Sequence, residues 1–564
     1  MKKAKTAHLE AVYVAVFLFL MLGISYGAIS DHRFNHDHPY GYMASDAFQH
    51  QVRAESIKQM GNYRHEPFWA AAGYKDAVGF YPPVLNDLSV MLSYGSGAET
   101  YDTIYFLVFF FIALGSILFY LVVRDFSRNL AIISLPFAIL VFSNNAYWGF
   151  VTGHWPSTMA QFFLIAVFWV MMRFRLEKSY LLLAVFVSAI IMSHASEVLF
   201  AVMFIAVFAG LKLLSKKMDS KEKKRMVRNL AIAVLIVLLL TFYFAVILKF
   251  TWLASSQGSM LSSFESQPAD LEGPALVLQD LGIVAVILLV GVAFSVWAIW
   301  KRSPSGLTAS VLMFLAGYGN HIGLVHWTGQ IRYLWPLYFS AAAGFGIYSI
   351  LKMSIKRWKV VYSFGIAIFL ILWFTGTFGI PPHYDRIEGR GLMDPYHWDA
   401  FTWTAENTPE DSTVYFFYGD IFSQNAMLRN TERKHIMYTS KGLEEVFSES
   451  LVPRYVHSKL IGDSHGVYYA YRRSFFDYGY YFIEDGGRDA YYRYYDICDM
   501  DYLFLDKVSQ QPALAQYNLL IRQELLSRDG FEEVYSNEVV SIIRNNNPGI
   551  ECLPEEGVKI DQQQ

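Results

Sequence analysis

Long uncharged apolar stretches recur along most of this chain, and they limit what it can fold into. Of its residues 54% are hydrophobic, and the mean hydropathy is +0.27. A segment of about 20 apolar residues is long enough to cross a bilayer as a helix. Eleven stretches of spanning or near-spanning length occur: Ala11–Ile29, Thr103–Val123, Leu130–Tyr147, Trp155–Met172, Tyr180–Met192, Val198–Leu214, Leu230–Leu248, Leu281–Trp300, Leu307–Val325, Tyr333–Leu351 and Val360–Ile380. We therefore expect an α-helical polytopic membrane protein with about 11 transmembrane helices.

The basic residues predict how these helices are oriented. With the N-terminus in the cytoplasm, every short cytoplasmic connection carries Lys or Arg, as the positive-inside rule requires. Examples are Arg124 and Arg128 after the second stretch and the run from Lys216 to Arg228 after the sixth. Eleven spans then place the C-terminus outside. Ala11–Ile29 is long enough to span and no good cleavage site follows it, so we interpret it as an uncleaved first span.

The composition changes near residue 380. Residues 1–380 are expected to form the membrane domain, with a long first extracytoplasmic loop at 30–102. Residues 381–564 are expected to form a soluble extracytoplasmic α/β domain, because short apolar runs at Ser412–Phe417 and Asp501–Leu505 alternate with a helical segment at Gln516–Ser527. The two cysteines, Cys498 and Cys552, either form a disulfide or remain free thiols. The aromatic stretch Tyr468–Tyr502 either packs this domain or stacks on sugar rings.

The first outer loop contains the most informative polar residues. If Asp46–Met60 is a helix, Asp46, His50, Arg53 and Ile57 lie on one face of it. A carboxylate, an imidazole and a guanidinium then converge just above the membrane. Asp46 has a simpler alternative role as a cap of its helix.

Three further turns are predicted on the same outer side. They contain His154, the pair His194 and Glu197, and a segment with His326 and Arg332. Such groups can bind a phosphate and assist acid–base chemistry. The alternatives are that Arg332 anchors a span at the interface and that the histidines are structural groups between helices.

Other common chemistries have no motif in this sequence. There is no P-loop, dinucleotide-binding glycine pattern, zinc-protease signature or Gly-x-Ser-x-Gly. A net charge of −3 gives no indication of nucleic-acid binding. His36-Asp37-His38 is either a metal cluster or, more simply, a solvated loop.

These residues resemble the GT-C superfamily of integral membrane glycosyltransferases, which use polyprenyl-phosphate sugars as donors. Ser45-Asp46-Ala-Phe-Gln-His50-Gln-Val-Arg53 is similar to the Asp-x-x-Tyr-His-x-x-Arg run in the catalytic subunit of oligosaccharyltransferases. Phe80-Tyr81-Pro82-Pro83 resembles the (Lys/Tyr)-Pro-Pro-Leu element of other members, with Tyr81 in place of the lysine that some members use. Gly153-His154-Trp155-Pro156 and Arg332-Tyr333-Leu-Trp-Pro336 are similar to outer-loop elements of archaeal members.

One departure from the family bears on the acceptor. Trp403 to Val414 resembles the segment that precedes the Trp-Trp-Asp motif of oligosaccharyltransferases, but Tyr415-Phe-Phe-Tyr-Gly-Asp420 follows instead. Phe475–Tyr480 is closer to that motif, yet it lies some sixty residues late. The resemblance therefore implies transfer of one sugar to a lipid-linked glycan, a polysaccharide or a protein, and not transfer of whole glycans to asparagine.

The resemblance also implies roles for the polar residues. Asp46 is the expected catalytic base or ligand of a divalent cation, Mg²⁺ or Mn²⁺. Arg332, Arg53, His154 and Tyr81 are expected to hold the carrier phosphate, and His50, His194, Glu197 and His326 to support the acceptor side. The expected location is the cell membrane, or the endoplasmic reticulum membrane in a eukaryote, and the expected partners are membrane lipids, the lipid-linked sugar and its acceptor. The alternatives are a transporter or flippase, which would place ionisable groups near mid-membrane and show repeated halves, and a non-catalytic assembly protein.

Overall fold

The computed structural model describes most of the chain, which forms two compact units. The described residues are 2–33, 36–70, 77–78, 81–142, 150, 153–173, 179–215, 218–245, 286, 337, 340–341, 343–345, 347–348, 359–374, 392–419, 425–449, 451–460, 468–472, 478–482, 492–509 and 512–559. Unit 1 comprises Met1–Asp31, Pro82–Leu88 and Tyr105–Pro382. Unit 2 comprises His32–Tyr81, Ser89–Ile104 and His383–Gln564.

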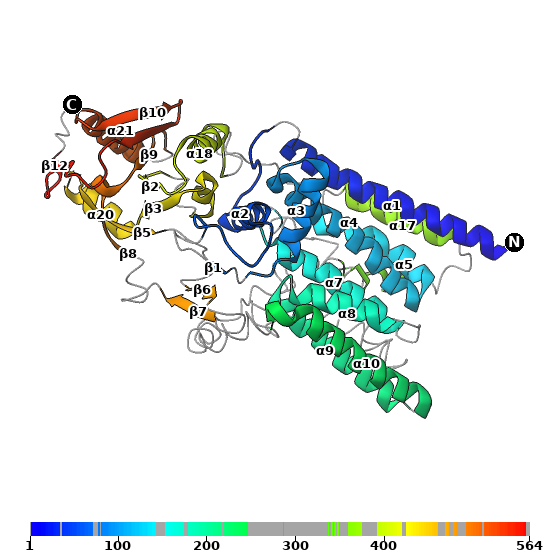
Figure 1. Ribbon diagram of the computed structural model, residues 1–564. Helices are drawn as coiled ribbons and strands as arrows, with labels where there is room; N and C mark the ends of the chain where they lie inside the picture. The colour runs from blue at the N-terminus through cyan, green and yellow to red at the C-terminus, as the bar shows by residue number, and fades with distance from the viewer. Residues whose placement is uncertain are drawn as a thin grey trace. The chain divides into compact units, whose positions relative to one another are not determined.

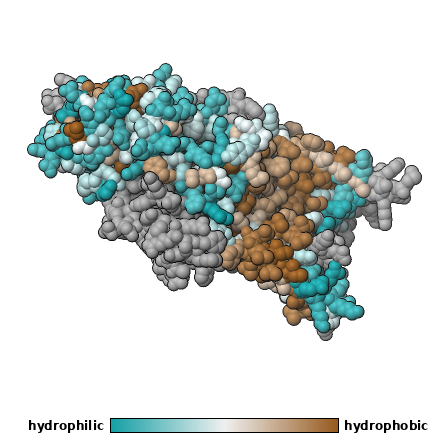
Figure 2. All heavy atoms as spheres, viewed as in Figure 1, coloured by the Kyte–Doolittle hydropathy of each residue, from teal (hydrophilic) through white to brown (hydrophobic). Residues whose placement is uncertain are grey.

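Unit 1 consists of apolar helices (Figure 1). In chain order they are α1 (Lys2–Arg33), α4 (Thr100–Phe126), α5 (Arg128–Ser134), η1 (Leu135–Phe142), α7 (Trp155–Met172), α8 (Ser179–Ile191), α9 (Ala195–Leu214), α10 (Ser220–Thr241) and α17 (Lys359–Phe374). Five helices among the described residues are long and apolar enough to cross a membrane, and three apolar segments are shorter. Figure 2 shows the corresponding hydrophobic surface in brown.

These helices correspond to eight of the eleven predicted stretches. The polytopic helical architecture is thus confirmed, while the number of spans stays a prediction. Leu281–Trp300 and Leu307–Val325 lie outside the described residues apart from residue 286, and only scattered residues of Tyr333–Leu351 are described. The helix α3 (Val84–Ser96), within the first outer loop, was not predicted.

The packed helices of unit 1 expose apolar side chains on their outer surface, and the buried carboxylate of Glu10 is paired with arginines. The helices α7, α8, α9 and α10 pack side by side, and Leu182, Leu199 and Leu239 are exposed on them. The carboxylate of Glu10 on α1 is almost buried, accepts a hydrogen bond from Tyr120 Oη at 2.8 Å and pairs with Arg124 and Arg128. Such pairing removes the cost of a buried lone charge.

Unit 2 is built around a seven-stranded mixed sheet with the strand order β10-β11-β9-β2-β3-β5-β8. The central strand β2 runs parallel to both β3 and β9, and the outer pairings are antiparallel. The strands are β2 (Thr413–Phe416), β3 (Lys434–Tyr438), β5 (Tyr455–Leu460), β8 (Tyr492–Asp496), β9 (Tyr502–Asp506), β10 (Phe531–Ser536) and β11 (Val540–Asn545). The predicted α/β domain is confirmed, and the predicted boundary near residue 380 stays a prediction.

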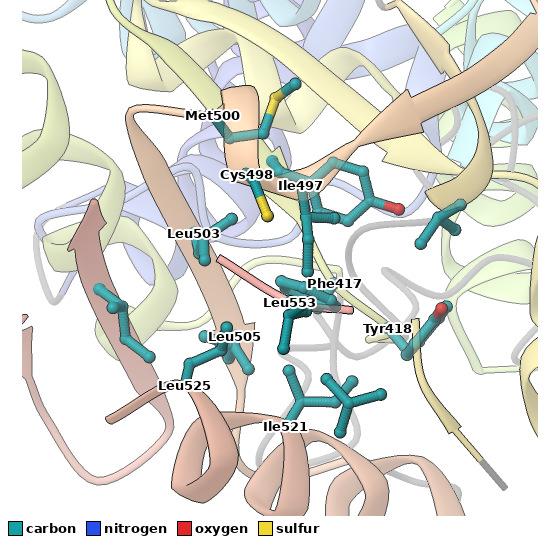
Figure 3. Packing of buried hydrophobic residues seen from close by; sticks show 14 of the residues in the cluster. Phe417, Tyr418, Ile497, Cys498, Met500, Leu503, Leu505, Ile521, Leu525 and Leu553 are labelled. Carbon is teal, nitrogen blue, oxygen red and sulfur yellow. The ribbon is translucent and has the colours of Figure 1, made fainter. Parts of the chain in front are cut away.

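Two helices cover opposite faces of this sheet. Leu503 and Leu505 of β9 pack with Ile521 and Leu525 of α21 (Pro512–Leu526), as Figure 3 shows. On the other face, Phe504 packs against Phe401 of α18 (Pro395–Asn407), with ring centroids 5.4 Å apart. Successive side chains of a strand point to opposite faces, so β9 is buried on both sides, and its residues Tyr502–Leu505 form a continuous apolar run.

Segments of the first outer loop belong to the same unit as the C-terminal domain. The helix α2 (Ser45–Met60) packs against α19 (Asn425–Leu428). The short strand β1 (Ala77–Val78) pairs with β6 (Tyr468–Arg472), which pairs with β7 (Tyr478–Phe482). The loop is therefore folded onto the α/β domain.

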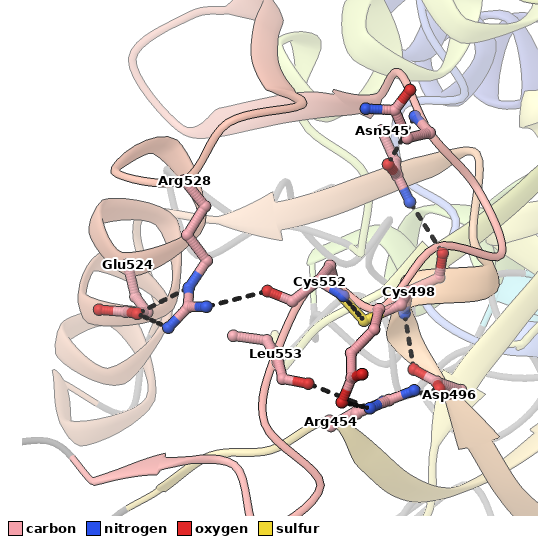
Figure 4. Close-up of a disulfide and its surroundings, with 10 residues drawn as sticks. Arg454, Asp496, Cys498, Glu524, Arg528, Asn545, Cys552 and Leu553 are labelled. Atoms are coloured by element: carbon pink, nitrogen blue, oxygen red, sulfur yellow. Dashed lines mark hydrogen bonds and ion pairs between the residues drawn. A yellow bond between two sulfur atoms is a disulfide. The ribbon is translucent and has the colours of Figure 1, made fainter.

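A disulfide between Cys498 and Cys552 ties the C-terminal segment to the end of β8. Hydrogen bonds from Arg454 to Asp496 and Glu551, and from Arg528 to the carbonyl of Cys552, surround it (Figure 4). Of the two alternatives left by the sequence, the disulfide is the one found. Disulfides persist in oxidising compartments, which agrees with an extracytoplasmic domain.

Replacing both cysteines by serine should lower the thermal midpoint of the α/β domain. The bond joins residues 54 positions apart, and the chain-entropy model gives about 4 kcal/mol for a loop of that size. Calorimetry of the purified protein measures the change. Reduction of the unmodified protein should lower the midpoint equally, and an unchanged midpoint in both would contradict the assignment.

A fully buried imidazole joins α18 to the sheet. The Nδ1 atom of His397 lies 2.7 Å from Asp394 Oδ2, and its Nε2 atom lies 3.4 Å from Asp506 Oδ2. Burial lowers the pKa of His397, but the two carboxylates outweigh it and raise the pKa to about 9. A protonated His397 thus links the N-cap residue of α18 to the end of β9.

Stability of this domain should fall between pH 6.5 and about pH 9. The folded-state pKa of His397 is raised above its ordinary value of 6.5, so its contribution is complete below pH 6.5 and is lost as pH rises through 9. The full effect is about 3 kcal/mol. His397→Gln should flatten this part of the curve of thermal midpoint against pH, whereas His457→Gln, at a half-buried ring, should not. An equally steep curve in His397→Gln would refute the role.

Candidate functional site

The first group of candidate residues lies on α2 in unit 2. The predicted helix Asp46–Met60 is confirmed, and it begins one residue earlier, at Ser45. Ala44 is the N-cap residue, so Asp46 stands in the first helical turn and does not cap the helix in the simple sense. The positive end of the helix dipole favours a carboxylate at that position. Asp46 is half-buried, while His50 and Arg53, one and two turns further on, are buried.

Tyr81 packs on this helix face. The guanidinium carbon of Arg53 lies 3.9 Å from the centroid of the Tyr81 ring, and the rings of His50 and Tyr81 are 5.3 Å apart. A cation over an aromatic face within about 6 Å is attracted by the ring quadrupole. The structure therefore brings together three of the predicted residues, from α2 and from the Tyr-Pro-Pro element, and holds the Arg53 side chain in place.

The motif Gly153-His154-Trp155-Pro156 begins α7 in unit 1. Gly153 has a φ of +95°, which favours glycine, and His154 is the N-cap residue. The Trp155 side chain is buried and donates to the carbonyl of Phe150, and Pro156 lies in the first turn. These residues thus shape the start of α7, and a chemical role for the half-buried His154 stays a prediction.

A buried carboxylate joins the first turns of α7 and α9. Glu197 is fully buried and accepts hydrogen bonds from Ser157 at 2.7 Å and Gln161 at 3.2 Å. Its second oxygen lies 2.6 Å from Nδ1 of His194. We call Ser157, Gln161, His194 and Glu197 the α7–α9 polar cluster. The carboxylate orients the imidazole, whose side chain is 35% exposed.

The chain segment after Tyr81 lies next to this cluster. The backbone N–H of Val84, which follows Pro82-Pro83, donates to the carbonyl of Met192 at 3.1 Å. Met192 is two residues before His194. Within unit 1, the proline pair and the His194 turn are therefore neighbours.

Ser157 and Gln161 were missed by the sequence analysis. Both are buried within an apolar span, where a side chain with hydrogen-bonding groups is costly unless it has a partner. Their spacing of four residues on one helix was the available signal.

Two predicted residues, His326 and Arg332, lie outside the described residues. Their roles stay predictions, as does a divalent cation at Asp46. Within the described ranges, no three His, Cys, Asp or Glu side chains are grouped so as to hold a metal ion. The rings of His36 and Tyr40 are stacked 3.6 Å apart and Asp37 is exposed, which agrees with a packed and solvated loop.

The described aromatic residues of the stretch Tyr468–Tyr502 include both buried and exposed rings. Tyr495 is buried in the core of the domain. Tyr494 is 51% exposed and lines a hollow of about 430 Å³ together with Tyr455, Glu445 and Glu555. Stacking of such exposed rings on sugars stays a prediction.

Comparisons with known proteins agree with this fold. No family model and no curated protein sequence matches the chain. Its structure is similar to the Archaeoglobus fulgidus oligosaccharyltransferase tethered with an acceptor peptide, with a TM-score of 0.52 and 11% identity over 94% of this chain and 74% of that one. ArnT from Cupriavidus metallidurans bound to undecaprenyl phosphate aligns over 96% of this chain and 99% of its own, with a TM-score of 0.48 and 9% identity. In a second structure of the archaeal enzyme, with an inhibitory peptide and a dolichol-phosphate, the chain spans 63% of that protein.

The chain therefore has a fold similar to that of the archaeal oligosaccharyltransferase. The chain itself has both features predicted from the sequence, the apolar helices and the C-terminal α/β domain.

Glu197→Gln should destabilise unit 1. The substitution removes the charge and places an amide N–H₂ among side chains that now donate to a carboxylate, and a hydrogen bond to a charged group is worth about 1.5–3 kcal/mol. The thermal midpoint of the purified protein measures the loss. Glu99→Gln, at a carboxylate 53% exposed, is the control and should have little effect. Equal midpoints for both variants would show that the cluster contributes nothing.

Proposed function

We propose that this protein is a membrane glycosyltransferase that moves one sugar from a polyprenyl-phosphate carrier to a lipid-linked glycan, a polysaccharide or a protein at the outer face. The fold match over 94% of the chain to an oligosaccharyltransferase is the observation that carries the proposal. It is supported by α2, which presents Asp46 at its N-terminal end with His50 and Arg53 following on one face.

The proposed reaction is a single displacement at C1 of the sugar. Asp46 accepts the proton of the acceptor hydroxyl as the new C1–O bond forms, and the bond from C1 to the carrier phosphate breaks with its electron pair leaving on the phosphate. The negative charge of Asp46 also stabilises the oxocarbenium-like transition state. The product has inverted configuration.

Cationic side chains are proposed to bind the carrier phosphate. Arg53, fixed by Tyr81, is the described arginine of the group, and Arg332 is the second candidate from the sequence. Guanidinium groups suit phosphate because they offer several N–H donors in a planar fork. His154, at the start of α7, is proposed to bind the same phosphate. His194, at the start of α9 and oriented by Glu197, is proposed to support the acceptor side. His50 and His326 are assigned supporting roles on the acceptor side.

Asp46→Asn should lower sugar transfer by about 10²–10⁴-fold, the usual contribution of a general base. Release of polyprenyl phosphate from a panel of polyprenyl-phosphate hexoses and pentoses, incubated with membranes containing the protein, gives the rate. Asp37→Asn, at an exposed carboxylate of the same loop, is the matched control and should retain normal turnover. Near-normal turnover in Asp46→Asn would remove this residue from the mechanism. If neither the protein nor its variants release the carrier phosphate, the result would favour the alternative function of a transporter or flippase.

A further inference from the structure

A second polar region of unit 1 lies at the end of the helices opposite to the α7–α9 polar cluster. There α7 ends at Met172, α9 ends at Leu214 and α10 begins at Ser220. Eight basic residues stand against two acidic ones between residues 212 and 228: Lys212, Lys216, Lys217, Lys221, Lys223, Lys224, Arg225 and Arg228 against Asp219 and Glu222. Figure 2 shows a hydrophilic surface at this end of α10.

A cavity of about 100 Å³ lies among these helix ends. Both apolar and polar side chains line it. The residues that line it are Met171, Met172, Phe208, Lys212, Met218, Glu222, Arg225, Met226 and Asn229. Two cationic side chains and one carboxylate therefore face a space otherwise lined by methionines, a phenylalanine and one amide.

Asn229 is the polar residue of this cavity that most needs a partner. It is only 5% exposed, and among the described residues its side chain makes no hydrogen bond. Its amide is not among the fully enclosed side-chain atoms that lack a partner in the described residues, so it is accessible from the cavity. A ligand with hydrogen-bonding groups in the cavity can therefore pair with this amide.

Lys212 sets the charge that the ligand should carry. Its ammonium lies 5.4 Å from the centroid of the Phe208 ring, in the last turn of α9. Lys212 and Arg225 carry two positive charges and Glu222 carries one negative charge, so the lining of the cavity has a net charge of +1. The surrounding segment, residues 212–228, has a larger positive net charge. The amide N–H₂ of Asn229 can donate to a phosphate oxygen, and the ammonium can pair with the same group.

We propose that this cavity binds the phosphodiester headgroup of an anionic phospholipid from the leaflet on the basic side of the membrane. The cavity volume suits the headgroup phosphate and not the whole lipid. Large apolar side chains are exposed beside it, at Leu214 and Val227, where acyl chains can pack. Basic pockets between spans on this side of a membrane bind anionic lipid headgroups, whereas a soluble anion gains nothing from the apolar surface. The proposal is independent of the sugar-transfer reaction.

The test is lipid binding to the purified full-length protein after delipidation in a neutral detergent. Native mass spectrometry counts retained phosphatidylglycerol, with phosphatidylcholine of the same acyl chains as the comparison and inorganic phosphate as the soluble probe. We expect one phosphatidylglycerol to be retained in preference to phosphatidylcholine, with no effect of millimolar phosphate. Lys212→Gln and Asn229→Leu should each weaken this binding about 10-fold or more.

Lys224→Gln is the matched control, because Lys224 is exposed in the same basic run and does not line the cavity. It should change the binding less than about twofold. Equal losses in Lys224→Gln and Lys212→Gln would overturn the proposal, since they would indicate general attraction of the basic run to anionic lipid. Equal retention of both lipids, or displacement of the lipid by phosphate, would also overturn it. If Asn229→Leu is not recovered folded, Lys212→Gln against its control decides the matter alone.

Discussion

The helices of unit 1 lie in a medium that cannot satisfy polar groups, and this constraint determines where their charged and hydrogen-bonding side chains are found. A carboxylate near hydrocarbon is tolerated only when it is paired or hydrogen-bonded. In the described part of the unit, Glu10 meets two arginines and Tyr120, and Glu197 meets Ser157, Gln161 and His194. Both carboxylates lie near helix ends, and each joins helices that are distant in the sequence.

The same constraint gives the two ends of unit 1 different chemistry. The end with the first turns of α7 and α9 contains a buried carboxylate that orients an imidazole. The opposite end is basic and contains the cavity with Lys212 and Asn229. An enzyme that takes a lipid-linked substrate needs reactive groups at one surface and an anchored position in the bilayer, and this division is compatible with both needs.

The architecture could be predicted from the sequence because it depends on local patterns. Length and lack of charge identified the helices, with α7 placed to the residue, and continuous apolar runs identified β2 and β9. The short span of α8 and the helix α2 followed from the same patterns. The sequence did not predict that most of the first outer loop belongs to the same unit as the α/β domain. That grouping depends on contacts between residues far apart in the sequence.

The candidate site could be predicted by residue type but not by contact. Asp46, His50 and Arg53 were found from helical spacing, and Tyr81 only from a motif; their meeting depends on how the loop folds back. Ser157 and Gln161 had no signal beyond their polarity in an apolar span and their spacing of four residues, because their importance comes from a glutamate on another helix. Similarly, nothing local to His397 foretells that Asp506, more than a hundred residues later, shares its buried position.

The central claim is that a sugar leaves a polyprenyl phosphate and becomes covalently bound to an acceptor. Its most direct test is to incubate membranes containing the protein with a polyprenyl-phosphate sugar labelled with ¹³C and to analyse the products by mass spectrometry and NMR. We expect free polyprenyl phosphate and the label in a new glycosidic bond of inverted configuration. Recovery of the labelled lipid intact on the opposite leaflet, with no labelled acceptor, would contradict it.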